Sequence, residues 1–206
     1  MGIASLPLEI QLILVPTILF ALTFHEYAHA RVAYLLGDYT SYYQNRMNLN
    51  PFNHLDPFGT FALYFLGFGW AKPVPVLMQN LKNPKSDMMM IAMAGPASNM
   101  FLAIVASIIY RLNFYFQLSE EVIFPLEIFI QINIVLAIFN LLPLNPLDGS
   151  RILPLIVKNP RTLYNIEVYG PRVLIGLIIL NLIGIPILST IILTPVSIIF
   201  YLLTGA

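Results

Sequence analysis

The sequence predicts an all-α polytopic membrane protein, built as a bundle of about four to six transmembrane helices. Of its 206 residues, 58% are hydrophobic and only 10% are charged, whereas a soluble domain carries about a quarter charged residues. The mean hydropathy is +0.80. The apolar residues are gathered in long runs, and about 20 such residues suffice to cross a bilayer as a helix. We therefore expect one transmembrane domain over residues 1–206.

Composition also limits the chemistry. The formal net charge is zero, so nothing indicates a nucleic-acid partner. The chain has no cysteine, which excludes disulfides, cysteine nucleophiles and thiolate zinc sites. Any transition metal must then be bound by nitrogen and oxygen atoms. No Lys or Arg precedes the first apolar run, so we expect the first helix to stay in the mature protein rather than act as a secretory signal.

The first apolar run, from Leu6 to Leu36, is predicted to be a transmembrane helix that stops at Gly37. Its C-terminal half contains His25-Glu26-Tyr27-Ala28-His29. Histidines four residues apart on a helix project from one face and can bind one metal ion. The glutamate between them is placed to take a proton from an activated water. Ionisable groups are costly inside a membrane and are kept mainly where they bind or react, although two merely hydrogen-bonded histidines near the interface are the alternative.

Residues 38–57 are polar and rich in Asn, Asp and Pro, which is typical of an ordered loop at the membrane surface. This loop contains the third histidine, His54. A loop histidine is most often a hydrogen-bonding surface group. A metal-ligand role and a role near the substrate are the alternatives for His54.

The next apolar segment, Gly59 to Trp70, has only 12 residues and cannot cross a bilayer as a helix. We expect a re-entrant or interfacial element near residues 59–76. Pro73 and Pro75 exclude a helix after it and favour an edge strand from Trp70 to Val76. The alternative is a short core helix followed by a plain loop.

Two further full spans are predicted, Met88 to Tyr110 and Val122 to Leu142, with a polar connection from Arg111 to Glu121. The first of these spans contains small residues around Asn99, which allow helices to pack closely. A last apolar stretch, Val173 to Leu203, contains a glycine and two prolines. It is compatible with one tilted span and also with a span plus a half-helix.

The third span leads into Pro143 and Pro146, which break the helix and place Asp148 on irregular backbone. Asp148 has two interpretations. As an oxygen ligand it would complete a His₂-carboxylate metal site with a fourth position open for water. As an N-cap it would instead begin a helix from Gly149 onward. The residues alone favour neither role.

The basic residues predict the orientation. Nine lysines and arginines fall on one face of the predicted bundle and only Arg111 on the other. By the positive-inside rule the basic face is cytoplasmic and the N-terminus lies outside. The same assignment brings His25, His29 and Asp148 to the cytoplasmic half of the membrane. The nine are Arg31, Arg46, Lys72, Lys82, Lys85, Arg151, Lys158, Arg161 and Arg172.

Three ordered motifs resemble the site-2 protease family of intramembrane zinc metalloproteases, in its compact prokaryotic form without a PDZ domain. They are His25-Glu26-x-x-His29, Gly95-Pro96-x-x-Asn99 and Asn140-x-x-Pro143-x-x-Pro146-x-Asp148-Gly149. The sequence departs from the family pattern at Ser150, where glycine often follows the Asp-Gly pair.

The resemblance implies one Zn²⁺ per chain, bound by His25, His29 and Asp148. It further implies Glu26 as the general base and Asn140 near the scissile carbonyl. It makes His54, Asn99 and Asn145 candidates for supporting or substrate-contacting roles.

The implied function is hydrolysis of peptide bonds within or near transmembrane helices of membrane proteins, and we expect single-span substrates in a prokaryotic cell membrane. The alternative is a non-catalytic zinc-binding scaffold or a metal transporter in the bilayer. A transporter would favour repeated halves with ionisable groups along a path, and the sequence shows no internal repeat. The sequence does not indicate the oligomeric state.

Overall fold

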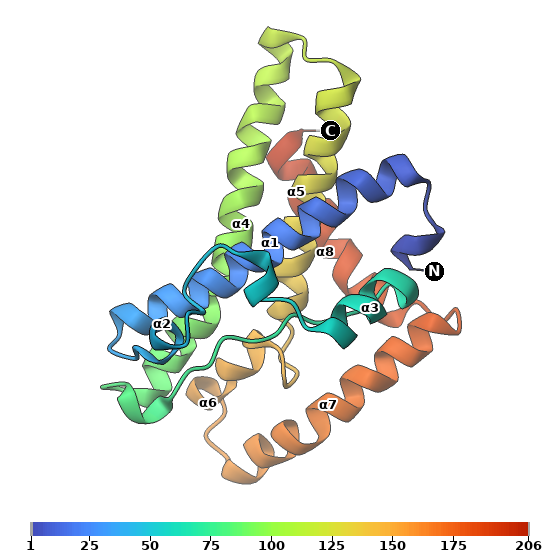
Figure 1. Ribbon diagram of the computed structural model, residues 1–206. Helices are drawn as coiled ribbons and strands as arrows, with labels where there is room; N and C mark the ends of the chain where they lie inside the picture. Colours follow the sequence, from blue (N-terminus) through green and yellow to red (C-terminus); the bar gives the residue numbers. More distant parts are fainter. Residues whose placement is uncertain (1, 206) are drawn as a thin grey trace.

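The computed structural model describes residues 2–205 as helices joined by short connections (Figure 1). Within this range five helices are long and apolar enough to cross a membrane, and the chain is an all-α multi-pass membrane protein as predicted. They are α1 (Leu8–Leu35), α4 (Pro84–Phe116), α5 (Glu120–Asn140), α7 (Pro160–Leu182) and α8 (Ile187–Thr204). The shorter elements are α2 (Thr40–Tyr43), α3 (Pro57–Leu66), α6 (Leu153–Ile156) and the 3₁₀ turns η1 (Ile3–Ser5), η2 (Pro51–Asn53), η3 (Met78–Asn80) and η4 (Asp148–Arg151).

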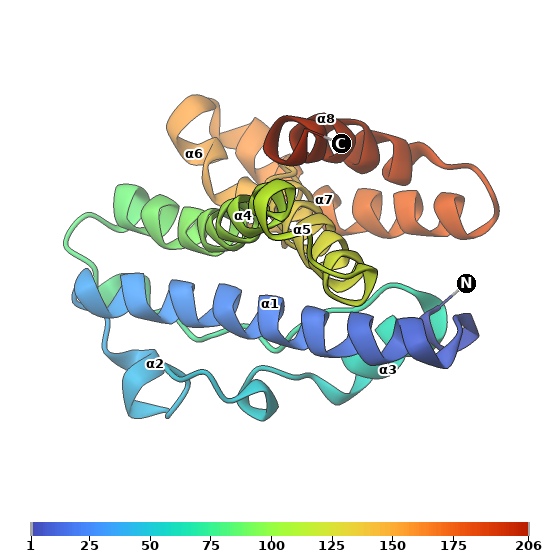
Figure 2. The same cartoon turned by 90° about the horizontal axis from the view of Figure 1, so that it is seen from above.

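The helices form layers around the antiparallel pair α4 and α5. Figure 2 shows α1 between this pair and the segment that carries α2 and α3, while α7 and α8 lie on the opposite side. Small residues on α4 allow α5 and α8 to approach closely, as in other membrane bundles. The main buried cluster joins these three helices and comprises Ala103, Ala106, Ile130, Ile134, Leu188, Ile192 and Val196.

Helix α4 is longer than predicted. It continues to Phe116, so the polar connection expected from Arg111 to Glu121 is reduced to residues 117–119. The prediction was wrong because Arg111 finds partners that local sequence does not reveal. Its guanidinium donates hydrogen bonds of 2.6 and 2.7 Å to the carbonyls of Leu203 and Leu202 at the end of α8.

The last apolar stretch forms two helices that turn at Gly184, where φ is +93°. Because Arg111 contacts the C-terminal end of α8, that end lies beside the C-terminal part of α4. Helix α7 begins after α6, at the opposite end of the bundle (Figure 1). Together α7 and α8 therefore make one net passage from one end of the bundle to the other, although each has the length and apolarity to cross alone.

The short apolar segment forms α3 and then folds back. The Asp56 carboxylate caps the helix by accepting from the Gly59 N–H at 2.7 Å, and Gly67 ends it with φ of +78°. The Tyr64 hydroxyl donates to Gln11 near the N-terminal end of α1. The returning chain reaches the other end of α1, where the Leu77 N–H donates to Asp38. The segment thus runs along α1 and returns, as a re-entrant element does.

The returning chain is extended but forms no ladder. Within residues 2–205 it makes one isolated antiparallel bridge, between Leu55 and Ala71, so the edge strand expected over residues 70–76 is present only as extended backbone. Two glycines hold it against α3. A Cβ on Gly69 would lie 2.1 Å from the Gly59 carbonyl oxygen, so a larger residue would separate the two arms.

Replacing Arg111 with methionine should lower the free energy of unfolding by about 1–2 kcal/mol, because two charge-assisted hydrogen bonds to the end of α8 are lost. Thermal unfolding in detergent micelles measures this effect. Lys158→Met, which removes an exposed cation at the other end of the bundle, is the matched control. Equal unfolding temperatures for the two variants would contradict the assigned role of Arg111.

Candidate metal centre

Three ligand-type side chains from distant parts of the chain meet beside α4. His25 and His29 lie one turn apart on α1 and are buried, while Asp148 is the first residue of η4. The two Nε2 atoms are 3.0 Å apart. The Asp148 Oδ2 lies 3.2 Å from the Nε2 of His25 and 3.3 Å from that of His29. Within residues 2–205 these three form the one group of His, Asp and Glu side chains whose geometry suits a metal ion.

The hydrogen bonds behind the imidazoles set their tautomers. The His25 Nδ1 lies 2.6 Å from the Asn99 Oδ1, and the His29 Nδ1 lies 2.7 Å from the Ile91 carbonyl oxygen. Both partners are acceptors, so each Nδ1 carries the proton and each Nε2 presents a lone pair. This arrangement, in which an oxygen atom holds the far nitrogen, is the usual support of a metal-binding histidine.

The converging atoms fit a tetrahedral divalent metal. The Asp148 Oδ2 is buried and has no hydrogen-bond partner among the described residues, so three lone pairs face one another without a donor. Nitrogen and oxygen ligands about 2.0–2.1 Å from a tetrahedral zinc ion are separated by about 3.3 Å. The observed separations of 3.0, 3.2 and 3.3 Å agree with this value.

Gly95 on α4 makes room for both imidazoles. A Cβ at this position would lie 2.4 Å from the His29 Nε2 and 2.5 Å from the His25 Nε2. The sequence indicated only that small residues here allow close helix packing. The structure adds a local reason, since any side chain at Gly95 would enter the space in which the ligand atoms converge.

The backbone around Asp148 excludes one of its two predicted roles. Leu147 occupies the N-cap position of η4, so Asp148 is not the cap. Its Oδ2 is instead directed at the two histidines. The following Gly149 lies tightly against the end of α5, where a Cβ would meet the Leu141 carbonyl oxygen at 2.2 Å.

Glu26 is buried next to His25, but its carboxylate is held by a different element. Its Oε2 accepts a hydrogen bond of 3.0 Å from the Val74 N–H in the extended chain that follows α3. The acid between the two histidines therefore faces the residue 72–77 segment, which we call the extended segment.

The extended segment is held from its other side by the loop after α1. The Arg46 guanidinium donates to the Lys72 carbonyl at 2.8 Å and to the Pro73 carbonyl at 3.3 Å. The Ser41 hydroxyl donates to the Pro75 carbonyl at 2.6 Å. Side chains of the loop thus take the place of a neighbouring strand.

Asp38 fixes the end of the same segment. Its buried carboxylate accepts from the Leu77 N–H and from the Asn80 side chain, each at 2.7 Å, and also from Thr40. Burial raises the pKa of Asp38, but these hydrogen bonds outweigh it and hold the pKa below its usual value. Asp38 is therefore ionised near neutral pH and anchors the segment as an acceptor.

The other predicted site residues lie around the cluster to different degrees. Asn99 contacts His25 directly, whereas His54 is buried in the loop with its Nε2 2.8 Å from the Asn48 carbonyl oxygen. The Asn140 amide donates to the Leu136 carbonyl one turn earlier in α5. Among the described residues no hydrogen bond connects His54 or Asn140 with the three ligand-type residues.

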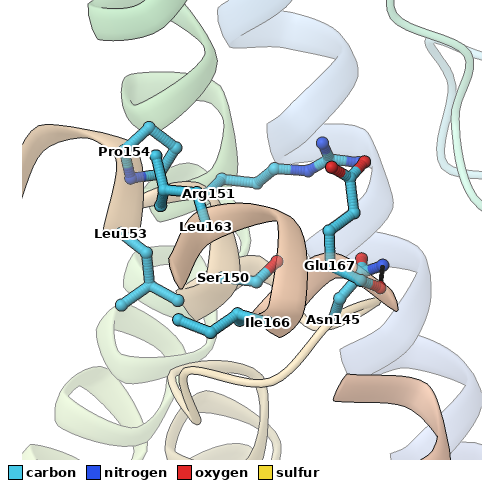
Figure 3. Close-up of a pocket in the computed structure, with 8 residues that line it drawn as sticks. All are labelled: Asn145, Ser150, Arg151, Leu153, Pro154, Leu163, Ile166 and Glu167. Atoms are coloured by element: carbon cyan, nitrogen blue, oxygen red, sulfur yellow. Dashed lines mark hydrogen bonds between the residues drawn. The ribbon is translucent and has the colours of Figure 1, made fainter. Parts of the chain in front are cut away.

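Asn145 packs against α7. Its amide donates to the Glu167 carbonyl at 3.2 Å, and the residue lines a small pocket between the η4–α6 segment and α7 (Figure 3). The pocket does not include His25, His29 or Asp148. The structure therefore places Asn145 at the contact with α7 rather than in the metal cluster.

Sequence reasoning missed Asn133, Asp38 and Arg46. Asn133 is a fully buried amide in α5 that bonds to Asn99. An amide inside an apolar span, two helical turns before Asn140, was the available signal. For Asp38 and Arg46 the sequence indicated only a polar loop, because the groups they hold, the Leu77 N–H and the Lys72 and Pro73 carbonyls, lie in a segment distant along the chain.

The fold and the cluster define a multi-pass membrane protein in which two buried histidines and a carboxylate could hold a metal ion. The family model described as "Peptidase family M50" matches residues 115–183. The "Putative zinc metalloprotease YwhC" of Bacillus subtilis (strain 168) is 43% identical over 153 residues, which cover 71% of this chain and 70% of that protein. No solved structure matches. The chain belongs to peptidase family M50, the site-2 protease family of membrane zinc metalloproteases that its motifs resemble.

Gly95→Ala should abolish binding of a divalent metal, because the new methyl group would displace both imidazoles. Metal content per purified chain, measured by elemental analysis, tests this expectation. Gly176→Ala is the matched control, since a Cβ at this helical glycine meets nothing within 4 Å. Full metal content in Gly95→Ala would show that the ligand geometry described above is wrong.

Proposed function

We propose that this protein is an intramembrane zinc metalloprotease, which hydrolyses peptide bonds within or near transmembrane helices of membrane-protein substrates. The observation that carries the proposal is the convergence of two Nε2 lone pairs, on the apolar helix α1 that also carries Glu26, with the buried Oδ2 of Asp148 in η4. Membership of a metalloprotease family supports the reaction class.

In the proposed mechanism His25, His29 and Asp148 bind one zinc ion per chain. Bound zinc supplies a Lewis acid that polarises the substrate carbonyl and makes water acidic enough to be activated at neutral pH. Glu26 accepts the proton of the attacking water and returns it to the leaving amine. Its hydrogen bond to the Val74 N–H orients the carboxylate before the substrate arrives.

Asn140 is the proposed aid to the developing oxyanion. One hydrogen of its amide nitrogen is used by the Leu136 carbonyl. An amide nitrogen carries two hydrogens, so the second remains to donate to a substrate oxygen. Asn99 supports His25 through the hydrogen bond to its Nδ1 and does not contact the substrate in this proposal.

The extended segment offers an edge on which a substrate can bind. A peptide bond in a helix is shielded by its own hydrogen bonds, so the substrate must unwind before cleavage. Pro73, Pro75 and Leu77 bond to the loop after α1, but the Val76 N–H and C=O have no hydrogen-bond partner among residues 2–205. We propose that an unwound substrate strand pairs with this free edge, next to Glu26.

The environment of the reaction is part of the proposal. We propose that residues 1–206 act as one transmembrane protease domain in a prokaryotic cell membrane, cleaving single-span substrates. The face that carries nine of the ten basic residues would be cytoplasmic, which places the reaction in the cytoplasmic half of the bilayer.

Glu26→Gln should reduce cleavage by at least about 100-fold, because it removes the general base while leaving the ligands in place. The assay uses purified protein in liposomes with a panel of labelled single-span substrates, together with a measurement of bound zinc. We expect the chelator-treated wild type to be inactive and Glu9→Gln, in the exposed first turn of α1, to match the wild type.

Two outcomes of this assay would contradict the proposal. Cleavage that survives Glu26→Gln would remove the assigned mechanism. An inactive wild type that retains one zinc ion per chain across the whole panel would favour the scaffold alternative.

Val76→Pro should raise KM for the single-span substrate by about tenfold or more, because it removes the free N–H while leaving the Val74–Glu26 bond intact. Val76→Ala is the control for lost packing, since the Val76 side chain packs against a buried cluster. Bound zinc should be unchanged in both variants. Equal kinetics in the two variants would exclude strand pairing at Val76.

A further inference from the structure

A second amide lies behind the metal cluster, deep in the bundle. Asn133 on α5 is fully buried among Ile130, Ile134 and Ala137, all with 0% exposure. A buried amide is costly unless its donors and its acceptor are bonded. Both polar atoms of Asn133 have partners, and one of these partners leads to His25.

Three hydrogen bonds connect the Phe129 carbonyl to His25, and the donor and the acceptor of each can be assigned. The Phe129 carbonyl can only accept, and it receives the Asn133 Nδ2 at 2.8 Å. The Asn133 Oδ1 therefore faces Asn99 and accepts from its Nδ2 at 3.0 Å. This leaves the Asn99 Oδ1 facing the His25 Nδ1 at 2.6 Å. The backbone of α5, together with the Ala21 carbonyl that also accepts from the Asn99 Nδ2 at 3.2 Å, thus determines which atom Asn99 presents to His25.

We propose that Asn133 is a positioning residue that fixes the tautomer of His25 through Asn99, and thereby keeps the His25 Nε2 able to bind the metal. The inference rests on the proposed zinc site. A residue of α5, Asn133, thus acts on His25 of α1 through the Asn99 amide of α4.

The alternative orientation of Asn99 shows why Asn133 is needed. If the Asn99 amide turned over, its oxygen would face two other oxygens, those of Asn133 and of the Ala21 carbonyl, which now accepts at 3.2 Å. Its nitrogen would face the His25 Nδ1, which would then have to be the unprotonated atom. The proton would move to Nε2, and a protonated Nε2 cannot bind a metal.

His29 has no such dependence. Its Nδ1 is bonded to the Ile91 carbonyl, a backbone acceptor that cannot turn over. The two imidazoles are thus supported differently, and only the His25 tautomer depends on side-chain amides. A change at Asn133 should therefore alter one histidine and leave the other unaffected.

The test compares Asn133→Leu, Asn133→Ala and Asn133→Asp. Leucine has the same number and branching of side-chain heavy atoms as asparagine but is larger and has no polar atom, and alanine provides a second, smaller apolar variant. Aspartate keeps the Asn99 amide in its present orientation in either protonation state, because a carboxyl oxygen still accepts from the Asn99 Nδ2. When neutral, its hydroxyl also donates to the Phe129 carbonyl. Asn181→Ala, which removes an amide that accepts from Ser189 on α8, is the control.

Two readouts are independent of proteolysis. Competition with a chromophoric chelator gives the zinc affinity, which should fall about 10- to 100-fold in the apolar variants and stay near the wild-type value in Asn133→Asp. Nitrogen NMR of metal-free protein with ¹⁵N-labelled histidine reports the tautomers directly. We expect the Nε2–H form to appear at His25 alone in the apolar variants.

The outcomes separate this inference from the proposed function. A wild type that binds no zinc would overturn the metal site itself. A wild type that binds zinc, with unchanged affinity and an unchanged His25 tautomer in folded Asn133→Leu, would overturn only the role of Asn133. Loss of zinc in Asn133→Asp equal to that in Asn133→Leu would overturn it as well.

Discussion

Three electron-pair donors converge in an apolar bundle, and the rest of the structure accommodates this constraint. The Nε2 atoms of His25 and His29 can offer lone pairs beside Asp148 only if both Nδ1 atoms carry the proton and donate it elsewhere, and α4 supplies the two acceptors. The same helix must come close without filling the space between the rings, which Gly95 permits. The contact of α1 with α4 is therefore determined by imidazole chemistry as well as by apolar packing.

The sequence revealed those parts of the site that are encoded locally. The spacing of His25, Glu26 and His29 predicts one helical face, and the breaks around Asp148 predict irregular backbone. It could not choose between ligand and N-cap for Asp148, because that choice depends on a contact with α1. It also missed Asn133, and it ended α4 too early at Arg111, because the carbonyls of Leu202 and Leu203 come together with that side chain only in the folded chain.

The extended segment shows how a predicted strand can exist without a sheet. Its prolines correctly excluded a helix, but its partners are the side chains of Arg46, Ser41 and Asp38 rather than another strand. Such partners satisfy one edge of the backbone, whereas on the other edge the Val74 N–H donates to Glu26 and the Val76 N–H and C=O are free. The residues predicted an edge strand or a plain loop here, and the structure has extended backbone with one isolated bridge.

This arrangement holds the general base of the proposed mechanism, which lies on α1, against the same short stretch of backbone that carries the proposed substrate-binding edge. Val74 bonds to Glu26, and Val76, two residues further on, presents its free N–H in the same direction, since alternate residues of extended backbone face the same edge. A substrate strand paired at Val76 would therefore be registered relative to Glu26 by two residues of backbone and the hydrogen bond from the Val74 N–H. The loop from Asp38 to His54 supports the extended segment from behind, so its side chains would help to set the distance between the scissile bond and the base without touching either.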